Sequence, residues 1–163
     1  YAQTDALTGL YNKETTEQLT DELLSEDENK YHAFLILDVD CFKQINDIYG
    51  HAVGDIVLQK FGKLLKGTFR EGDILGRIGG DEFGVIMKNI QTKDIAMKKA
   101  GELLAKTQAY KIDELKGNNI SISIGISTAP QDGDCYMDLY KRADQALYQA
   151  KRSGKARVCN YFS

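Results

Sequence analysis

Acidic side chains gather at two points of the sequence where a strand is expected to end or turn. Asp38 directly follows the apolar run 33–37, which has the length and composition of a strand buried on both faces. Asp81 and Glu82 follow a pair of glycines between two short apolar segments, which favours a tight hairpin. If these strands are neighbours, the three carboxylates converge and repel one another. A hard divalent cation such as Mg²⁺ relieves that repulsion, so the sequence predicts a metal site.

Each acidic group also has a simpler interpretation. Asp38 alone fits a helix cap, and Asp81 with Glu82 fits a solvated hairpin tip. Two acidic groups at neighbouring strand ends favour the metal site over two unrelated surface features. Such a site leaves coordination positions for substrate phosphates.

The residues that follow the first acidic group suit a nucleotide. The backbone N–H groups of Cys41 and Phe42 are expected to open a helical turn, a position that binds phosphate oxygens, and Lys43 adds a positive charge. Asn46 and Asp55 offer an amide and a carboxylate, which together match the carbonyl and N–H groups of a guanine edge. Taken alone, Asn46 close to a glycine is ordinary turn chemistry.

Hydrophobic spacing predicts the elements that position these groups. Helices are expected at 13–24, 53–65, 93–108 and 137–150, and strands at 33–37, 74–78, 82–87, 120–126 and 157–162. Residues 120–126 alternate isoleucine with small or polar residues, which predicts a strand with one face in the core. The order is a ferredoxin-like βαββαβ unit of the α+β class, with an extra N-terminal helix and a C-terminal edge strand.

Composition sets the limits on function. The 163 residues, 42% of them hydrophobic, predict one globular domain spanning 1–163, and the start at Tyr1 suggests that it is excised from a larger protein. The net charge of −3 argues against a nucleic-acid partner. Three cysteines without a paired framework predict a reducing compartment, and the apolar runs are too short to span a bilayer. We therefore expect a cytoplasmic domain without membrane contact of its own.

Four motifs carry a resemblance to a known family. Residues 79–83 read GGDEF, and the segment 38–55 reads DxDxFKxxND followed by GHxxGD. Residues 5–12 match DxLTGLxN, and 143–151 match ADxALYxAK. In order and spacing, the chain resembles the GGDEF domains, which are diguanylate cyclases when intact.

This resemblance implies an activity and a fold. The family condenses two GTP molecules into cyclic di-GMP with release of two pyrophosphates, on a palm similar to that of nucleotidyl cyclases and polymerases. Each domain holds one GTP, so a homodimer is expected to complete the active site. The alternative is a catalytically silent module that binds GTP or cyclic di-GMP. A cyclase for another purine is disfavoured by Asp55, because adenine has no matching ring donor.

The resemblance also implies roles for individual residues. Metal binding, by two Mg²⁺ or alternatively Mn²⁺ ions, falls to Asp38, the Val39 carbonyl, Asp81 and Glu82. Asp81, Glu82 and Lys43 are the expected catalytic groups, with Glu82 in metal binding or proton transfer. The substrate-binding set is Cys41, Phe42, Lys43, Asn46, His51, Asp55, Gly79, Gly80, Lys151 and Lys155.

Two further segments bear on substrate grip and regulation. Where the family often has GRN after the last helix, this chain has Gly154-Lys155-Ala156. The lysine keeps a positive charge but loses the two parallel hydrogen bonds that an arginine can donate.

Arg70 and Asp73 match the family's RxxD inhibitory site in type and spacing, which implies cyclic di-GMP as an inhibitor as well as a product. A surface ion pair is the simpler interpretation of Arg70 and Asp73. The second basic residue of such a site falls to Lys98 or Lys99.

Overall fold

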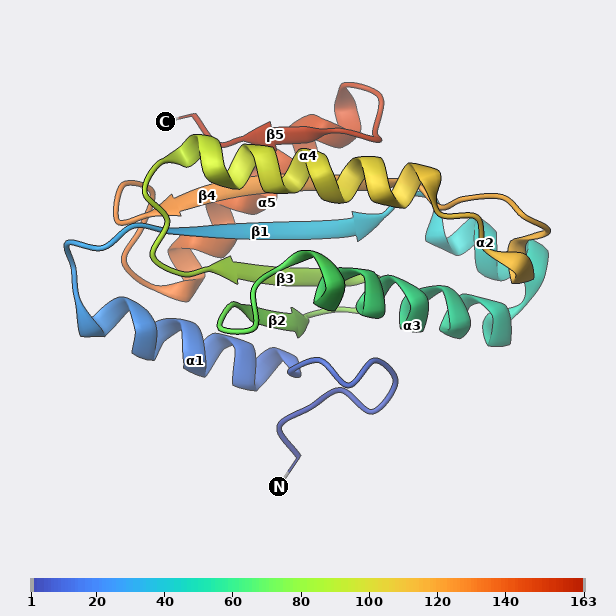
Figure 1. The fold of residues 1–163 in the computed structure, drawn as a ribbon, viewed down its shortest axis with the longest axis horizontal. Coiled ribbons are helices and arrows are strands. Elements are labelled where there is room, and N and C mark those ends of the chain that lie inside the picture. The colour runs from blue at the N-terminus through green and yellow to red at the C-terminus, as the bar shows by residue number, and fades with distance from the viewer. Residues whose placement is uncertain (1, 163) are drawn as a thin grey trace.

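Five strands form a single sheet in the computed structural model, which describes residues 2–162 (Figure 1). The strands are β1 (His32–Val39), β2 (Ile74–Arg77), β3 (Glu82–Met87), β4 (Ile122–Ala129) and β5 (Val158–Asn160). The helices are α1 (Lys13–Glu26), α2 (Phe42–Tyr49), α3 (His51–Thr68), α4 (Lys93–Ala109) and α5 (Tyr136–Arg152), with a short 3₁₀ turn, η1 (Asp113–Leu115).

The strand order is β2-β3-β1-β4-β5, with antiparallel pairing except between β4 and the edge strand β5. This order confirms the predicted α+β, βαββαβ arrangement with an added N-terminal helix and C-terminal edge strand. Its consequence for function is that β1, in the centre, lies directly beside β3, the second strand of the hairpin. The two acidic segments therefore meet at one end of the sheet.

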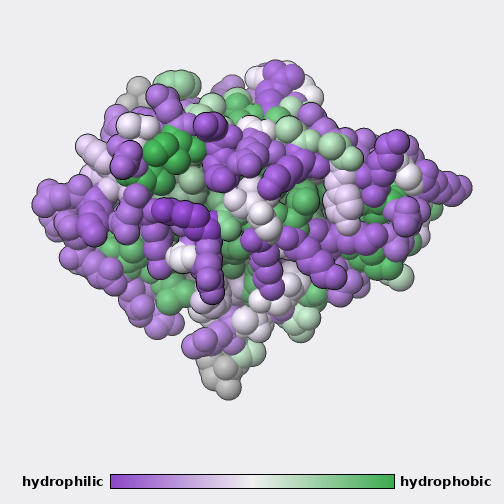
Figure 2. Space-filling model, in the orientation of Figure 1, coloured by the Kyte–Doolittle hydropathy of each residue, from purple (hydrophilic) through white to green (hydrophobic). Residues whose placement is uncertain are grey.

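Helices cover the sheet on both sides, with α3 and α4 on one face and α1 and α5 on the other (Figure 1). The alternation of side chains along β1 divides the core between the two faces. On the first face Phe61 packs edge-on against Phe83, with ring centroids 5.0 Å apart. On the second face Phe34 packs against Tyr136 at 5.4 Å. Figure 2 shows mostly hydrophilic residues on the outside of the α3–α4 layer, which is the solvated side of these amphipathic helices.

The expectation that β4 buries only one face is wrong, because all eight of its residues are buried. The small residues of β4 lie under α5 instead of facing solvent. A Cβ on Gly125 would come within 2.2 Å of the Ala143 carbonyl oxygen, and the Ser127 hydroxyl donates to the Leu139 carbonyl at 2.8 Å. Small residues here allow the helix backbone to approach the strand closely.

A two-turn helix, α2, occupies the segment for which the sequence indicated only a helical turn. Gly50 separates it from α3 and adopts φ +91°, a conformation that glycine reaches without steric cost. The break at Gly50 lets α2 pack against α3. The GHxxGD motif, at the start of α3, therefore lies close to the residues of α2.

No helix within residues 2–162 combines the length and apolar character needed to cross a bilayer. The three thiols, Cys41, Cys135 and Cys159, are all free.

Candidate active site

The register of the central strands brings the two acidic segments together. Asp38, near the end of β1, is the Cα partner of Glu82, the first residue of β3. The Val39 N–H donates to the Asp81 carbonyl at 3.3 Å, which ties the hairpin to the end of β1. Because Asp38 and Glu82 follow the alternation of the α5-facing core residues, both side chains lie on the face that α5 covers.

Asp38 is the carboxylate of this cluster whose two oxygens have the most different surroundings. Its Oδ2 contacts the Nζ of Lys151 in an ion pair, whereas its buried Oδ1 has no hydrogen-bond partner among the described residues. Burial and the adjacent Asp81 outweigh the lysine and raise the pKa of Asp38 to about 7. Burial lowers the pKa of Lys151, but its bond to Asp38 reverses the balance, and the net direction is upward.

Glu82 has a partner from the same helix. The Tyr140 hydroxyl donates to its Oε1 at 2.8 Å. Burial and the nearby Asp38 carboxylate raise the pKa of Glu82, although the Tyr140 bond acts in the opposite direction. Asp38 and Glu82 thus both hold protons more tightly than free carboxyls do.

This cluster fits a divalent cation. Asp38, Asp81 and Glu82 place three carboxylates beside one ammonium group, and Asp38 Oδ1 is a buried acceptor without a donor. Carboxylate oxygens are preferred ligands of hard divalent cations. A bound cation would satisfy the unpartnered oxygen and remove the repulsion that raises the pKa of Asp38.

Asp40 contributes to the site in a way that the sequence did not indicate. Its Oδ1 accepts from the Ser123 hydroxyl at 2.6 Å, and its Oδ2 accepts from the Ser121 hydroxyl at 2.6 Å and the Ala156 N–H at 3.1 Å. Asp40 therefore fastens the loop after α5, which carries Lys155, to the end of β1. The sequence feature that could have indicated this role is the pair Ser121 and Ser123, two hydroxyl donors at alternate positions of the segment beside β1.

The start of α2 lies close to the loop that follows α5. Cys41 adopts a left-handed conformation with φ +56°, and no side chain caps the helix that begins at Phe42. The Nζ of Lys155 lies 3.2 Å from the Cys41 Sγ. Lys43 extends into solvent from the first turn of α2. Uncapped N–H groups and two lysines make this surface suitable for phosphate oxygens.

Asn46 and Asp55 also come together, across the α2–α3 junction. A Cβ on Gly54 would lie 1.9 Å from the Asn46 Oδ1, so the amide packs directly on Gly54, next to Asp55. The Asn46 Oδ1 is buried and has no partner among residues 2–162, whereas Asp55 and His51 are exposed. The structure thus places the Asn46 amide against the residue that precedes Asp55, and the recognition of a guanine edge by these two groups stays a prediction.

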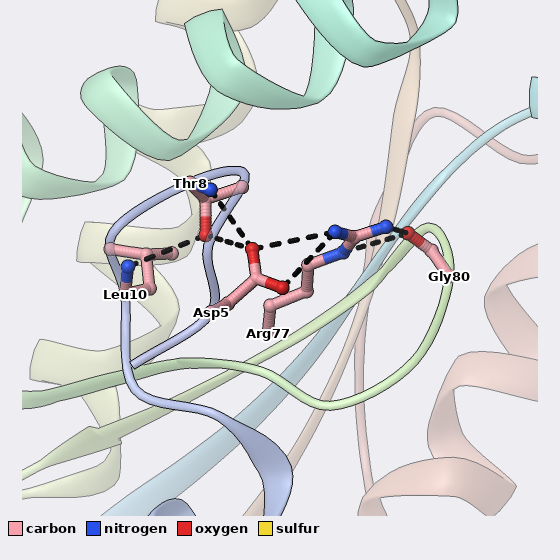
Figure 3. A network of polar contacts seen from close by, with 5 residues as sticks. All are labelled: Asp5, Thr8, Leu10, Arg77 and Gly80. Atoms are coloured by element: carbon pink, nitrogen blue, oxygen red, sulfur yellow. Dashed lines mark hydrogen bonds and ion pairs between the residues drawn. The ribbon is translucent and has the colours of Figure 1, made fainter. Parts of the chain in front are cut away.

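An arginine holds the glycine hairpin in place, as Figure 3 shows. The Arg77 Nε and Nη2 donate to the Gly80 carbonyl at 3.0 and 2.7 Å, and its Nη1 contacts Asp5 at 3.2 Å. Asp5 also accepts from the Thr8 N–H at 2.9 Å. Although burial opposes its ionisation, the Thr8 bonds and the Arg77 charge lower the pKa of Asp5. Arg77 thus joins the N-terminal turn to the hairpin.

The glycines themselves leave the hairpin surface open. A Cβ on Gly80 would meet nothing within 4 Å, and one on Gly79 would meet only the Glu82 Cβ at 3.3 Å. Neither glycine has a positive φ. The backbone conformation therefore does not require glycine here, and the expected benefit is close approach by a ligand.

Comparison with known proteins identifies the family. Residues 2–157 match the family described as diguanylate cyclase, GGDEF domain. The chain belongs to the GGDEF domain family. It is 40% identical to Diguanylate cyclase A of Treponema denticola over 128 residues, which cover 77% of this chain and 34% of that protein. Overall, the chain spans between 34% and 45% of the length of the first curated relatives it matches.

Solved GGDEF structures have the same fold. The isolated GGDEF domain of TpbB from Pseudomonas aeruginosa superposes with a TM-score of 0.92 at 33% identity, covering 98% of this chain and 94% of that one. The GGDEF domain of DgcB from Caulobacter crescentus, in complex with c-di-GMP, gives a TM-score of 0.91 at 26% identity, covering 100% and 95% of the two chains.

Arg70 and Asp73 of this GGDEF domain lie at the opposite end of β2 from the glycine hairpin. The Arg70 Nη2 contacts the Asp73 Oδ1 at 3.3 Å, and the arginine side chain is 61% exposed. A cavity of about 250 Å³ beside this pair is lined by Lys99. Of the two lysines considered from the sequence, Lys99 is therefore the one positioned near Arg70.

Proposed function

We propose that this chain condenses two GTP molecules into cyclic di-GMP with release of two pyrophosphates. The observation that carries the proposal is the buried Asp38 Oδ1, which has no hydrogen-bond donor within residues 2–162 and belongs to a carboxylate close to those of Asp81 and Glu82. A domain that did not bind a cation would gain stability by replacing this group. Membership of the GGDEF family and the similarity to Diguanylate cyclase A support the same reaction.

The groups proposed to hold two divalent cations, Mg²⁺ or Mn²⁺, are Asp38, the Val39 carbonyl, Asp81 and Glu82. When bound, the cations supply activation of the attacking 3′-hydroxyl and charge neutralisation on the leaving pyrophosphate. Lys151 neutralises one oxygen of Asp38 and so limits repulsion within the cluster when GTP is absent. Near GTP the same ammonium group is within reach of a phosphate.

The remaining proposed residues bind and orient the nucleotide. The N–H groups of Cys41 and Phe42 donate to phosphate oxygens, which Lys43 and Lys155 also attract. The open surface at Gly79 and Gly80 lets the hairpin lie against the nucleotide. The proposed guanine contacts are Asn46, Asp55 and His51.

The reaction also needs a second chain. One domain binds one GTP, and its 3′-hydroxyl must reach the α-phosphate of another, so two copies face each other across a two-fold axis. Specific activity is therefore expected to rise with protein concentration. Activity that stays flat over a hundredfold dilution of a monomeric sample would contradict the dimer.

The decisive experiment incubates the 163-residue chain with GTP and Mg²⁺ and identifies the product by mass. We expect cyclic di-GMP and pyrophosphate, no turnover in EDTA, and loss of turnover in Asp81→Ala. If that variant kept more than about a tenth of the rate, Asp81 would not be a metal ligand, because loss of a metal ligand costs several kcal/mol.

Calorimetric titration with ATP and with GTP tests the base contacts. Equal affinities for the two nucleotides would show that Asp55 does not contact the base.

A catalytically silent binding module is the second candidate, favoured by the cavity beside Arg70 and by the c-di-GMP held by the DgcB domain. Binding of cyclic di-GMP without turnover of GTP at any protein concentration would select it. Both candidates use guanine nucleotides, and the three free thiols suit a reducing compartment such as the cytoplasm.

A further inference from the structure

One side of α5 reaches both central carboxylates of the candidate active site. Tyr140 and Lys151 are eleven residues apart, which is about three helical turns, so they lie on the same side of the helix. Tyr140 donates to Glu82, and Lys151 pairs with Asp38. The lysine belongs to the ADxALYxAK motif, whereas Tyr140 lies before that motif and was assigned no role.

The Tyr140 ring is held by the core. It lies 5.9 Å from the ring of Tyr136, one turn earlier on α5, with an interplanar angle of 30°. Tyr136 is in turn packed edge-on against Phe34 of β1, with centroids 5.4 Å apart. The hydroxyl of Tyr140 is therefore delivered to Glu82 from a fixed ring, and little side-chain entropy remains to be lost when the bond forms.

The bond to Glu82 is the only hydrogen bond to that side chain among the described residues. Glu82 is the first residue of β3, next to the open hairpin, and a glutamate side chain has three rotatable bonds with which to turn away from Asp38. The bond from Tyr140 holds one of the two oxygens and so restricts these rotations. Donors of this kind behind a ligating carboxylate set its orientation and strengthen metal binding.

We propose that Tyr140 is a positioning residue, whose hydroxyl orients the Glu82 carboxylate for the divalent cation. The inference rests on the proposed function, since it concerns the same carboxylate cluster. Tyr140 acts through Glu82, which accepts the one hydrogen bond that the Tyr140 hydroxyl makes among the described residues. Its removal should weaken metal binding and leave metal-free nucleotide binding unchanged.

The chain offers a matched control one turn away on the same helix. The Tyr136 hydroxyl is buried and has no partner among residues 2–162, so Tyr136→Phe removes a hydroxyl without removing a bond. Tyr140→Phe removes a hydroxyl together with its bond to Glu82. Tyr136→Phe therefore controls for the loss of a tyrosine hydroxyl from this side of α5.

The test measures Mn²⁺ binding to the 163-residue chain by electron paramagnetic resonance, with urea unfolding to check that each variant is folded. We expect Tyr140→Phe to weaken Mn²⁺ binding by about 10–100-fold and Tyr136→Phe to leave it unchanged. Affinity for GTP in EDTA should be the same in both variants. Equal Mn²⁺ affinity in the two variants, or no Mn²⁺ binding by the wild type, would overturn the proposal.

A second background separates this inference from the cyclase reaction. In Glu82→Ala, Tyr140→Phe should cause no further loss of Mn²⁺ affinity, because Tyr140 has no carboxylate left to orient. A loss as large as in the wild type would show that Tyr140 acts elsewhere. Both arms are readable without turnover, so a chain that bound Mn²⁺ but made no cyclic di-GMP would contradict the proposed function and leave this inference standing.

Discussion

Asp38 and Asp73 are both buried aspartates paired with a basic side chain, yet their environments differ. The Asp73 carboxylate accepts from the Arg70 N–H at 3.2 Å, the Arg70 Nη2 at 3.3 Å and the Lys88 N–H at 3.1 Å, so both oxygens have donors. In Asp38, one oxygen contacts Lys151, and the other is buried without a hydrogen-bond partner in the part of the chain that the structure describes. Asp81 and Glu82 add repulsion at Asp38.

The difference distinguishes a structural carboxylate from one suited to a ligand. Three donors offset the cost of burying Asp73, which closes the turn before β2. The cost at Asp38 is not fully offset by any group within residues 2–162, and the divalent cation that we propose there would supply the missing contact. Asp40, with three donors of its own only two residues away, resembles Asp73 rather than Asp38.

The strongest test of this contrast is Asp38→Asn. We expect turnover to fall by at least about a hundredfold, since a metal ligand is worth several kcal/mol. The free energy of unfolding in EDTA should stay the same or rise, because the variant removes a carboxylate whose ionisation is opposed by burial and by Asp81 more strongly than Lys151 favours it. Steady-state synthesis of cyclic di-GMP and urea denaturation measure the two quantities. A variant that lost both activity and stability would place Asp38 in the same class as Asp73.

Arg70→Ala tests whether the other end of β2 has a regulatory role. If cyclic di-GMP binds there, its inhibition constant should rise by about 5–150-fold, which corresponds to a coupling of 1–3 kcal/mol. Stability should change by less than about 1 kcal/mol, because the arginine side chain is 61% exposed. The measurement is product inhibition during steady turnover. Inhibition that the substitution does not alter would place the product at the active site instead.

Asp73→Asn should show the opposite pattern to Asp38→Asn. One oxygen that accepts hydrogen bonds becomes an NH₂ group facing donors, and we expect a loss of about 1–3 kcal/mol in the free energy of unfolding. Urea denaturation in EDTA, with Asp38→Asn measured in parallel, gives the comparison. An unchanged stability would mean that the bonds to Lys88 and Arg70 contribute nothing net.

The last expected effect is a difference in the pH dependence of stability. The folded-state pKa of Asp38, about 7, lies above the unfolded value of 3.8, so the folded chain binds the proton more tightly between these values. Stability in EDTA should therefore fall as pH rises from about 4 to 7 more steeply in the wild type than in Asp38→Asn. Mg²⁺ should reduce the difference, because a cation favours the ionised carboxylate. Parallel stability curves for the two proteins would show that Asp38 does not titrate in this window.

The sequence by itself determined the order of elements and the two acidic segments. Apolar runs mark β1 and β3 because both strands are buried on both faces, and Gly79-Gly80 marks the turn between β2 and β3. The proximity of Asp38 to Glu82 followed from the βαββαβ order, since that topology places the first strand beside the hairpin. These features depend on local patterning, which a single sequence carries.

Only the tertiary structure decided the contacts between segments that are distant in the chain. The alternation in 120–126 predicted that Ser123 faces solvent, but Ser123 is buried and donates to Asp40, 83 residues away. The partner of Arg77 is 72 residues away at Asp5, and that of Tyr140 is 58 residues away at Glu82. Polarity and spacing do not reveal which donor satisfies which carboxylate. That assignment depends on side-chain directions fixed when the sheet and α5 pack together.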